Sequence, residues 1–390
     1  MTRCCRVCAV GLLLLVCPVG ASAQSAAAAA PPAVAPAPLR YGEAVGAARA
    51  LVQADLAERG YPGIAIAVSV GGETVWSEGF GYADLEHRVP MWPSVKFRVG
   101  SISKPMTAAA VATLVEEGRL DLDVPIQRYV PSFPEKAYPI TTRQLGGHLG
   151  GIRHYAGNEN FIRDPYATVV DALSIFKDDA LLHAPGTAFA YSSYGFNLIS
   201  AVVEGASGQA FLDYMRDAVF GPLGMHDTVA DFVTSIIPQR TGYYVRDGDR
   251  HLINAPFVDN SYKWAGGGFL STTEDVLRFA NAHLRDDFLS PSAKRLLFTE
   301  QQTRDGVGVG YGFGWFIRTD DAGRRLLYHA GGSVGGTSLM IMQPDTRVVV
   351  VGLINLTGAN NGVVREVLSL FLDAVAASPS LHERGGRSHR

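Results

Sequence analysis

The sequence predicts an α/β (α+β) fold in which both ends of the chain build one antiparallel sheet, with flanking helices and an inserted, mainly helical lobe. Three observations lead to this prediction. Strand-like segments joined by short turns occur near both ends, helical periodicity flanks them, and the middle of the chain carries helix and loop patterns. Short hairpin connections indicate antiparallel neighbours, because parallel strands need long crossovers. A doubly wound parallel sheet is thereby excluded.

The N-terminal residues are predicted to lie outside the folded domain. A short basic region precedes an apolar stretch over residues 9–20, and an Ala-Ser-Ala sequence before Gln24 has the pattern that signal peptidase cleaves. We interpret residues 1–23 as a signal peptide, with an uncleaved membrane anchor as the alternative. Alanine and proline dominate residues 24–39, which we interpret as a linker. The mature protein is therefore expected to be exported, periplasmic or extracellular, with no stable membrane span.

The hydrolase domain is predicted over residues 40–378 and begins with a helix and a hairpin. Apolar residues recur at helical spacing in residues 42–59, and Gly60 marks the end of that helix. Residues 63–70 and 74–82 are strand-like and are joined by two glycines. This pattern predicts one amphipathic helix followed by two paired strands.

The rest of the domain is predicted as a helical lobe followed by more strands. The lobe covers about residues 124–250, where strand alternation is weak. Further strands are predicted at residues 314–318, 325–329, 337–343 and 347–353. An amphipathic helix then carries Val363, Val367, Leu370 and Phe371. The polar, basic residues 379–390 are interpreted as a flexible tail.

Composition removes several classes of function. All four cysteines lie in the predicted leader, at positions 4, 5, 8 and 17. The mature chain would therefore have no thiol nucleophile, disulfide or cysteine-ligated metal. The formal net charge is −3, and removal of Arg3 and Arg6 makes it more negative by two. No nucleic-acid partner is expected, because such proteins carry a basic footprint.

A Ser-x-x-Lys motif provides the first candidate for chemistry. Ser101 and Lys104 open a helical pattern, and residues three apart on a helix are neighbours, with about 5–6 Å between their Cβ atoms. A serine hydroxyl needs a neighbouring base, and a desolvated lysine can provide one. The motif alone is weak, because Ser174 and Lys177 form a second copy.

Downstream residues favour the first copy. Tyr191-Ser-Ser precedes an apolar helix, and His329-Ala-Gly ends a predicted strand and enters a glycine-rich turn. Enzymes that recognise penicillin need such a loop residue and such a strand motif after the Ser-x-x-Lys. Ser174 lies too close to Tyr191 to belong to the same scheme. Tyr191 and His329 could each be an ordinary packed residue, and their order along the chain argues for function.

Taken together, these motifs resemble the serine β-lactamase-like and penicillin-binding hydrolase family, namely its class C β-lactamase, D-Ala carboxypeptidase and class VIII esterase group. The resemblance covers about residues 41–375, and residues 122–155 look closest to the mitochondrial serine β-lactamase-like members. The motifs are FRVGSISKPMT from Phe97, EEGRLDLD from Glu116, PGT from Pro185, YS from Tyr191, GPLGM from Gly221, AGG from Ala265 and HAGG from His329.

The resemblance implies a β-lactamase/transpeptidase-like fold and a role for each matching residue. Ser101 would be the acylated nucleophile, Lys104 its activating partner, and Tyr191 would share the proton transfers. Residues Ser193, His329, Gly331 and Gly332 would contact the substrate or the oxyanion, the N–H groups of Ser101 and Gly332 forming the oxyanion hole. No metal or organic cofactor is implied. The expected substrate is a small peptide, an ester or a β-lactam.

Two departures from the family pattern bear on the substrate. Ser193 replaces the asparagine of the Tyr-x-Asn motif, and His329 replaces the lysine of the Lys-Thr-Gly strand motif. Both weaken the case for efficient β-lactam hydrolysis. His148-Leu-Gly-Gly also differs from the usual His-Thr-Ser-Gly, and the sequence gives no consequence for that change.

The sequence offers two alternatives from other classes of function. Residues 331–335 match the G-x-S-x-G motif of α/β-hydrolases, but that motif needs a strand-to-helix elbow, and the flanks of Ser333 are strand-like. A non-catalytic binding or filament-forming protein on the same scaffold is the second alternative, and the complete set of Ser101, Lys104 and Tyr191 argues against it. The oligomeric state is not predicted by the sequence.

Overall fold

The computed structural model describes residues 39–377. The predicted signal peptide (1–23), the predicted tail (379–390) and all of the predicted linker except Leu39 lie outside the described residues. Leu39 begins a short 3-10 turn, η1 (Leu39–Tyr41), which leads into α1 (Gly42–Arg59). Within the described residues, no helix is both long enough and apolar enough to cross a bilayer.

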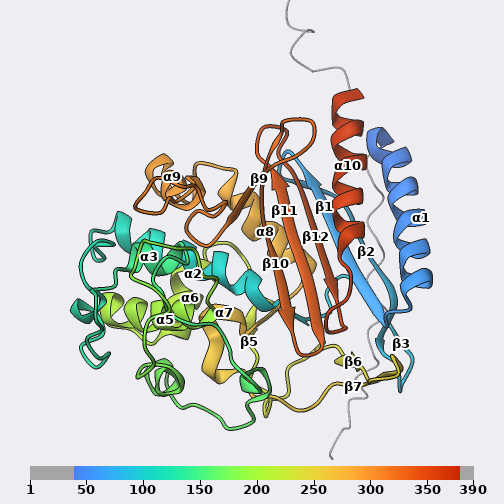
Figure 1. Ribbon diagram of the computed structural model, residues 1–390. Helices are drawn as coiled ribbons and strands as arrows, with labels where there is room; N and C mark the ends of the chain where they lie inside the picture. Colours follow the sequence, from blue (N-terminus) through green and yellow to red (C-terminus); the bar gives the residue numbers. More distant parts are fainter. Residues whose placement is uncertain (1–38, 378–390) are drawn as a thin grey trace, which may run out of the picture. The chain divides into compact units, whose positions relative to one another are not determined.

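Both ends of the domain contribute to one seven-stranded sheet, in the order β3-β2-β1-β12-β11-β10-β9 (Figure 1). Every neighbouring pair is antiparallel, which confirms the predicted sheet. The strands are β1 (Gly63–Val70), β2 (Glu73–Asp84), β3 (Val89–Pro90), β9 (Phe316–Thr319), β10 (Arg325–Ser333), β11 (Gly336–Gln343) and β12 (Val348–Ile354).

Strand β10 is longer than the sequence indicated. Its predicted end was residue 329, with a glycine-rich turn to follow, but pairing with β11 continues to Ser333 opposite Gly336. The cross-strand hydrogen bonds thus keep the two glycines in the ladder. The segment around Ser333 is strand, turn and strand, so the elbow that an α/β-hydrolase needs is not formed there.

The two faces of the sheet pack against different helices. Alternate residues of β1 point to opposite faces, so Ile64, Ile66 and Val68 join the core beneath α1 and α10 (Gly362–Ala377). Ala65 and Ala67 point the other way. On that face the Ser69 hydroxyl donates to the side chain of Asn281 in α8 (Thr273–His283) at 2.9 Å.

The helical lobe lies beside the sheet and surrounds α2 (Ser103–Glu116), which is buried on nearly all sides. An apolar helix of this kind is typical of a protein interior. The other helices of this region are α3 (Thr142–Gly146), α4 (Val169–Ala172), α5 (Ser193–Ser207), α6 (Phe211–Met215), α7 (Trp264–Gly267) and α9 (Pro291–Phe298). Single turns are η2 (Gly100–Ile102), η3 (Ile126–Arg128), η4 (Glu159–Phe161), η5 (Leu173–Ile175), η7 (Ser261–Lys263) and the π-helical η6 (Arg216–Phe220). Short strands are β4 (Phe97–Arg98), β5 (Val229–Ala230), β6 (Tyr244–Arg246), β7 (Leu252–Asn254) and β8 (Phe269–Ser271).

Candidate active site

Ser101 and Lys104 lie together where η2 joins α2. Ser101 belongs to the 3-10 turn rather than to the α-helix that its spacing predicted, and α2 begins two residues later. The two side chains still meet, with 3.0 Å between Lys104 Nζ and Ser101 Oγ. The other Ser-x-x-Lys copy is elsewhere: the exposed Ser174 in η5 donates its hydroxyl proton to the carbonyl of Asp171 in α4.

Lys104 is fully buried and has three polar neighbours. Besides Ser101, its Nζ lies 2.9 Å from Ser193 Oγ and 2.7 Å from the carbonyl oxygen of Gly266. Neither neighbour carries a negative charge. Burial lowers the pKa of Lys104 well below its usual value, and the charge of Lys263 lowers it further. The amine therefore has a strong tendency to be neutral.

Tyr191 is held over Lys104 by the start of α5. Ser192 caps that helix by accepting the Gly195 N–H at 2.9 Å, which fixes the preceding residue. The Tyr191 hydroxyl is hydrogen-bonded to Ser101, and its ring centroid is 4.8 Å from Lys104 Nζ. Burial raises the pKa of Tyr191 above its usual value, and the bond to Ser101 opposes that change. Tyr191 is thus a protonated phenol at neutral pH.

His148, for which the sequence suggested no consequence, supports this arrangement. Its ring centroid lies 4.3 Å from that of Tyr191, and its Nδ1 accepts the Ser192 N–H at 3.1 Å. Burial lowers the pKa of His148 well below its usual value, so the ring is neutral and can accept that bond. The histidine therefore positions the tyrosine loop.

The edge of β10 beyond Tyr328 lies against η2, because β9 pairs with β10 only as far as that residue. Gly331 is required there: a Cβ atom on it would lie 2.1 Å from the Val99 carbonyl oxygen and 3.0 Å from the Ser101 nitrogen. Gly332 faces open space and lines the same cavity as Ser101. The Ser101 N–H, at the start of a helical turn, has no backbone acceptor among residues 39–377.

His329 lies deeper than the other predicted residues. It is fully buried, and its Nε2 is 3.0 Å from the hydroxyl of Tyr311. Its Nδ1 lies 2.7 Å from the Ala330 carbonyl oxygen and must carry the proton, so Nε2 accepts from Tyr311. Burial lowers the pKa of His329 to about 3. Its ring is 6.3 Å from that of Tyr191, and direct contact with substrate stays a prediction.

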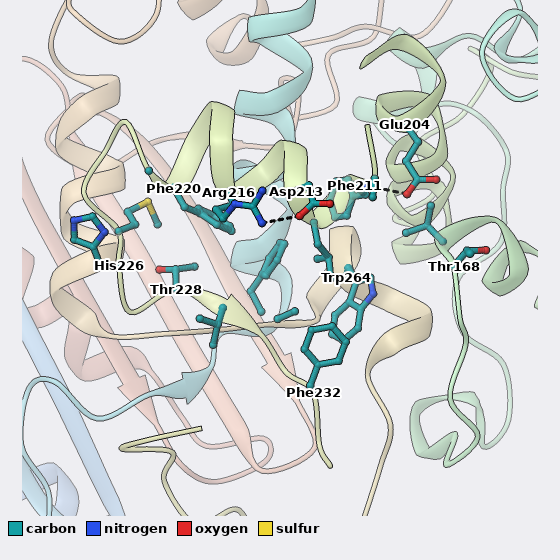
Figure 2. Close-up of a pocket in the computed structure, with 18 of the residues that line it drawn as sticks. Thr168, Glu204, Phe211, Asp213, Arg216, Phe220, His226, Thr228, Phe232 and Trp264 are labelled. Atoms are coloured by element: carbon teal, nitrogen blue, oxygen red, sulfur yellow. Dashed lines mark hydrogen bonds and ion pairs between the residues drawn. The ribbon is translucent and has the colours of Figure 1, made fainter. Parts of the chain in front are cut away.

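Ser101 opens onto a cavity of about 430 Å³. Its lining comprises Ser101, His154, Tyr155, Asn160, Phe161, Ser193, Lys263, Gly266, Gly267, Gly332, Ser333, Val334, Thr357 and Gly358. A larger cavity of about 680 Å³, lined by Phe211, Phe232 and Trp264 among others, contains none of the predicted site residues (Figure 2). Proximity to Ser101 and Lys104, rather than size, identifies the smaller cavity as the candidate active site.

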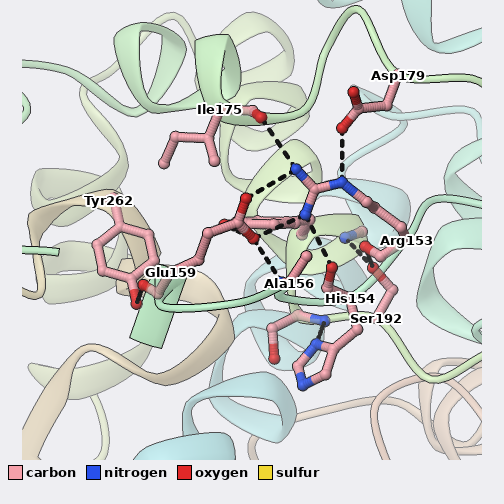
Figure 3. A network of polar contacts seen from close by, with 11 residues as sticks. Arg153, His154, Ala156, Glu159, Ile175, Asp179, Ser192 and Tyr262 are labelled. Atoms are coloured by element: carbon pink, nitrogen blue, oxygen red, sulfur yellow. Dashed lines mark hydrogen bonds and ion pairs between the residues drawn. The ribbon is translucent and has the colours of Figure 1, made fainter. Parts of the chain in front are cut away.

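A loop that contributes His154, Tyr155, Asn160 and Phe161 to the cavity lining is anchored by Arg153. Figure 3 shows the polar contacts of Arg153. The guanidinium binds both oxygens of Glu159, at 2.7 and 2.9 Å, and Asp179 at 2.6 Å. The loop also bonds to the start of α5, since Ser192 Oγ donates to the Arg153 carbonyl at 2.7 Å and the Ser193 N–H donates to His154 Nδ1 at 3.1 Å. These bonds hold the loop beside Lys104.

Sequence reasoning missed three residues of the site: His154, Tyr155 and Lys263. The first two lie within residues 122–155, the segment that resembles the mitochondrial family members, and Lys263 belongs to none of the motifs that carry the resemblance. A lysine directly before the Trp-Ala-Gly-Gly run was the available signal. In the part of the chain that the structure describes, no group of three or more His, Cys, Asp or Glu residues could hold a metal ion.

Comparison with known proteins shows the family of this chain. The family model described as Beta-lactamase matches residues 48–371. The chain belongs to the β-lactamase family. This β-lactamase-family chain is 34% identical over 400 residues to the human mitochondrial serine β-lactamase-like protein LACTB, an alignment that covers 78% of this chain and 73% of the relative.

Two solved structures have a fold similar to that of this chain. An octameric penicillin-binding protein homologue from Pyrococcus abyssi is 28% identical with a TM-score of 0.75, covering 84% of this chain and 77% of that chain. A D-amino acid amidase from Ochrobactrum anthropi SV3 is 25% identical with a TM-score of 0.71, covering 87% and 100%. The β-lactamase/transpeptidase-like fold expected from the sequence is thereby confirmed.

Proposed function

We propose that the protein is an exported serine hydrolase that cleaves an amide or ester through an acyl-enzyme on Ser101. One observation carries the proposal: the Ser101 hydroxyl lies 3.0 Å from a buried lysine amine that has no carboxylate partner within residues 39–377. A hydroxyl is a weak nucleophile until a base takes its proton. Lys104 is placed to be that base, and burial favours its neutral form.

The three neighbours of Lys104 fit a neutral amine. Such an amine has two N–H donors and one lone pair. The Gly266 carbonyl can only accept, at 2.7 Å, and Ser193 Oγ accepts the second N–H at 2.9 Å. The lone pair is then left for the Ser101 hydroxyl. Ser193 therefore belongs to the machinery that holds the base, in addition to lining the cavity.

The reaction proceeds in two halves. Ser101 Oγ attacks the carbonyl carbon and transfers its proton to Lys104, while the N–H groups of Ser101 and Gly332 stabilise the oxyanion. As the carbon–nitrogen or carbon–oxygen bond breaks, Tyr191 donates its proton to the leaving group and regains one from Lys104. Water then attacks the acyl-enzyme, loses its proton through the same groups, and releases the acid and free Ser101.

The substrate class is a peptide, an ester or, weakly, a β-lactam. Similarity to a D-amino acid amidase and to a penicillin-binding protein homologue supports amide cleavage. Ser193 and His329 replace the family residues that favour β-lactams. We expect slow nitrocefin hydrolysis and faster cleavage of a small ester or a D-Ala-D-Ala peptide.

Labelling with an active-site fluorophosphonate tests the nucleophile. Mass spectrometry should place the adduct on the peptide that contains Ser101, and Ser101→Ala should abolish both labelling and turnover. Ser174→Ala and Ser333→Ala are the matched controls and should retain most activity. An adduct on Ser333 would overturn the mechanism, and the absence of any adduct would favour the non-catalytic alternative.

Export is tested separately by the N-terminal sequence of the mature protein. The small-x-small pattern predicts a chain that begins at Gln24. A retained leader in a membrane fraction would support the anchored alternative.

A further inference from the structure

Lys263 is a charged residue of the cavity to which the proposed mechanism gives no role. It ends η7, directly before α7, the helix that supplies the Gly266 carbonyl to Lys104. Only 4% of the residue is exposed, and it lines the same cavity as Ser101. No aspartate or glutamate is among the lining residues. The cavity therefore has a cationic side chain and no lining carboxylate.

The ammonium group of Lys263 lacks a polar partner. Within residues 39–377 its Nζ makes no hydrogen bond and no ion pair. It lies 5.1 Å from the ring centroid of Tyr262 and 5.8 Å from that of Tyr155. Cation–π contact of this kind recovers only part of the hydration that a buried ammonium loses.

Asp231, the carboxylate whose charge acts on Lys263, is already paired with other groups. Asp231 accepts a bond from Arg98 at 2.7 Å and another from Asn260 at 2.6 Å, and Arg240 lies 3.7 Å away. Two guanidinium groups thus lie beside one carboxylate, and among residues 39–377 no carboxylate pairs with Lys263. Burial and, to a smaller extent, the charge of Arg98 lower the pKa of Lys263 to about 7, and the charge of Asp231 opposes both effects.

Lys96 shows how the same fold treats a buried lysine that has only a structural role. Lys96 is only 6% exposed, and its Nζ donates a hydrogen bond to the Asp227 carboxylate at 2.7 Å. A buried cation ordinarily has such a partner, because leaving it unpaired destabilises the protein. Lys263 is therefore a cation whose partner is to be supplied from the cavity.

We propose that Lys263 binds a carboxylate of the substrate, so that the enzyme prefers amides or esters with a carboxylate close to the scissile bond. This inference rests on the proposed acyl-enzyme function and names its substrate class. The carboxylate could belong to the acyl group or to the leaving group. Both sources share the same chemistry at Nζ, and the two substrate arms below distinguish them.

The pH dependence of the preference follows from the groups around Nζ. These are Arg98 and Asp231, the aromatic rings of Tyr155 and Tyr262, the buried Lys104 and the cavity-lining His154. Lys263 loses its proton as pH rises through about 7. The preference for a carboxylate is consequently largest below that pH and decreases above it.

Pairs of substrates that differ in one group measure the preference. The acyl arm compares glutaryl-7-amino-4-methylcoumarin with its terminal carboxamide, and the leaving-group arm compares N-acetyl-3-aminobenzoate with N-acetyl-3-aminobenzamide. In at least one of the two arms we expect kcat/KM to be about tenfold or more higher for the carboxylate than for the carboxamide. This ratio corresponds to the free energy of one charge-assisted hydrogen bond. The ratio should fall from about pH 6 to about pH 8.5, because Lys263 becomes neutral.

Two variants test the residue itself. Lys263→Met should bring the ratio close to one, whereas Lys96→Met, the same change at a paired buried lysine, should leave it as in the wild type. Fluorophosphonate labelling shows whether the active site of the Lys263→Met variant is still assembled. If this variant is not labelled, Lys263→Gln is used in its place. A wild-type ratio near one in both arms, or a ratio that survives in both Lys263 variants, overturns the proposal.

Binding without turnover separates this proposal from the proposed function. Calorimetry on Ser101→Ala with each carboxylate and carboxamide pair measures recognition alone. A carboxylate preference in a protein that no fluorophosphonate labels would support Lys263 and contradict the acyl-enzyme. Labelling of Ser101 without any carboxylate preference would support the acyl-enzyme and contradict the role of Lys263.

Discussion

Ser193 Oγ accepts a hydrogen bond from Lys104 Nζ at 2.9 Å, although the two residues are 89 positions apart in the chain. The sequence suggested that Ser193 contacts the substrate. The structure also connects it to the proposed base, because the start of α5 lies against the first turn of α2. A substitution at this serine should therefore change proton transfer as well as substrate binding.

Ser193→Ala should shift the pH profile of hydrolysis. The serine oxygen accepts an N–H of Lys104 and stabilises the ammonium form more than the neutral amine, so its loss lowers the Lys104 pKa. The limb on which kcat/KM rises with pH should move to lower pH, with a several-fold loss at the plateau. An uncharged ester is the appropriate substrate. Ser200→Ala, also buried in α5 but bonded to the Asn197 carbonyl, is the control and should not move the limb.

Activity of the wild-type protein should increase with pH as Lys104 becomes neutral. Burial lowers the Lys104 pKa, so the neutral amine is present above that lowered value and is lost as pH falls through it. Lys104→Arg should lose about 100-fold or more in kcat/KM, because a guanidinium cannot accept the proton. Lys96→Arg keeps the ion pair with Asp227 and should stay active. Substantial activity in Lys104→Arg would make Tyr191 the principal base.

Gly100→Ala should disrupt the site through backbone contact. Gly100 has φ +51, and a Cβ atom there would lie 2.7 Å from the Gly332 carbonyl oxygen. We expect η2 and β10 to move apart, with a large loss of fluorophosphonate labelling. Gly118→Ala is matched, because Gly118 has φ +69 but faces open space. It bears the backbone strain without the clash, and equal losses in both variants would contradict this account.

Arg153→Met should loosen the cavity wall. The side chains of Arg153 and Glu159 are only 20% and 22% exposed, so loss of their paired bonds should lower the free energy of unfolding by about 1–3 kcal/mol, measured by urea titration. KM for an uncharged ester should rise as well. Arg216→Met, which removes a solvent-exposed guanidinium paired with Asp213 and Asp217, should change neither value.

Local patterns predicted most of the scaffold. α1 begins and ends where its periodicity and Gly60 indicated, and β1 matches its predicted residues. These elements depend on neighbours in sequence, so their signal is contained in short windows. The predicted end of β10 was wrong, because the last residues of the strand are held by pairing with β11. Glycine content in a short window of sequence does not reveal that pairing.

The sequence by itself determined the fold class and the family. It also determined the pairing of Ser101 with Lys104, because residue spacing within one helical turn places both side chains together. Only the tertiary structure decided which other groups surround that pair. His148, Ser193 and Lys263 come from segments distant along the chain, and their roles depend on burial and on which partners remain unoccupied. Burial removes water from both lysines, and that desolvation, produced by the packing of the whole domain, lowers the pKa of each.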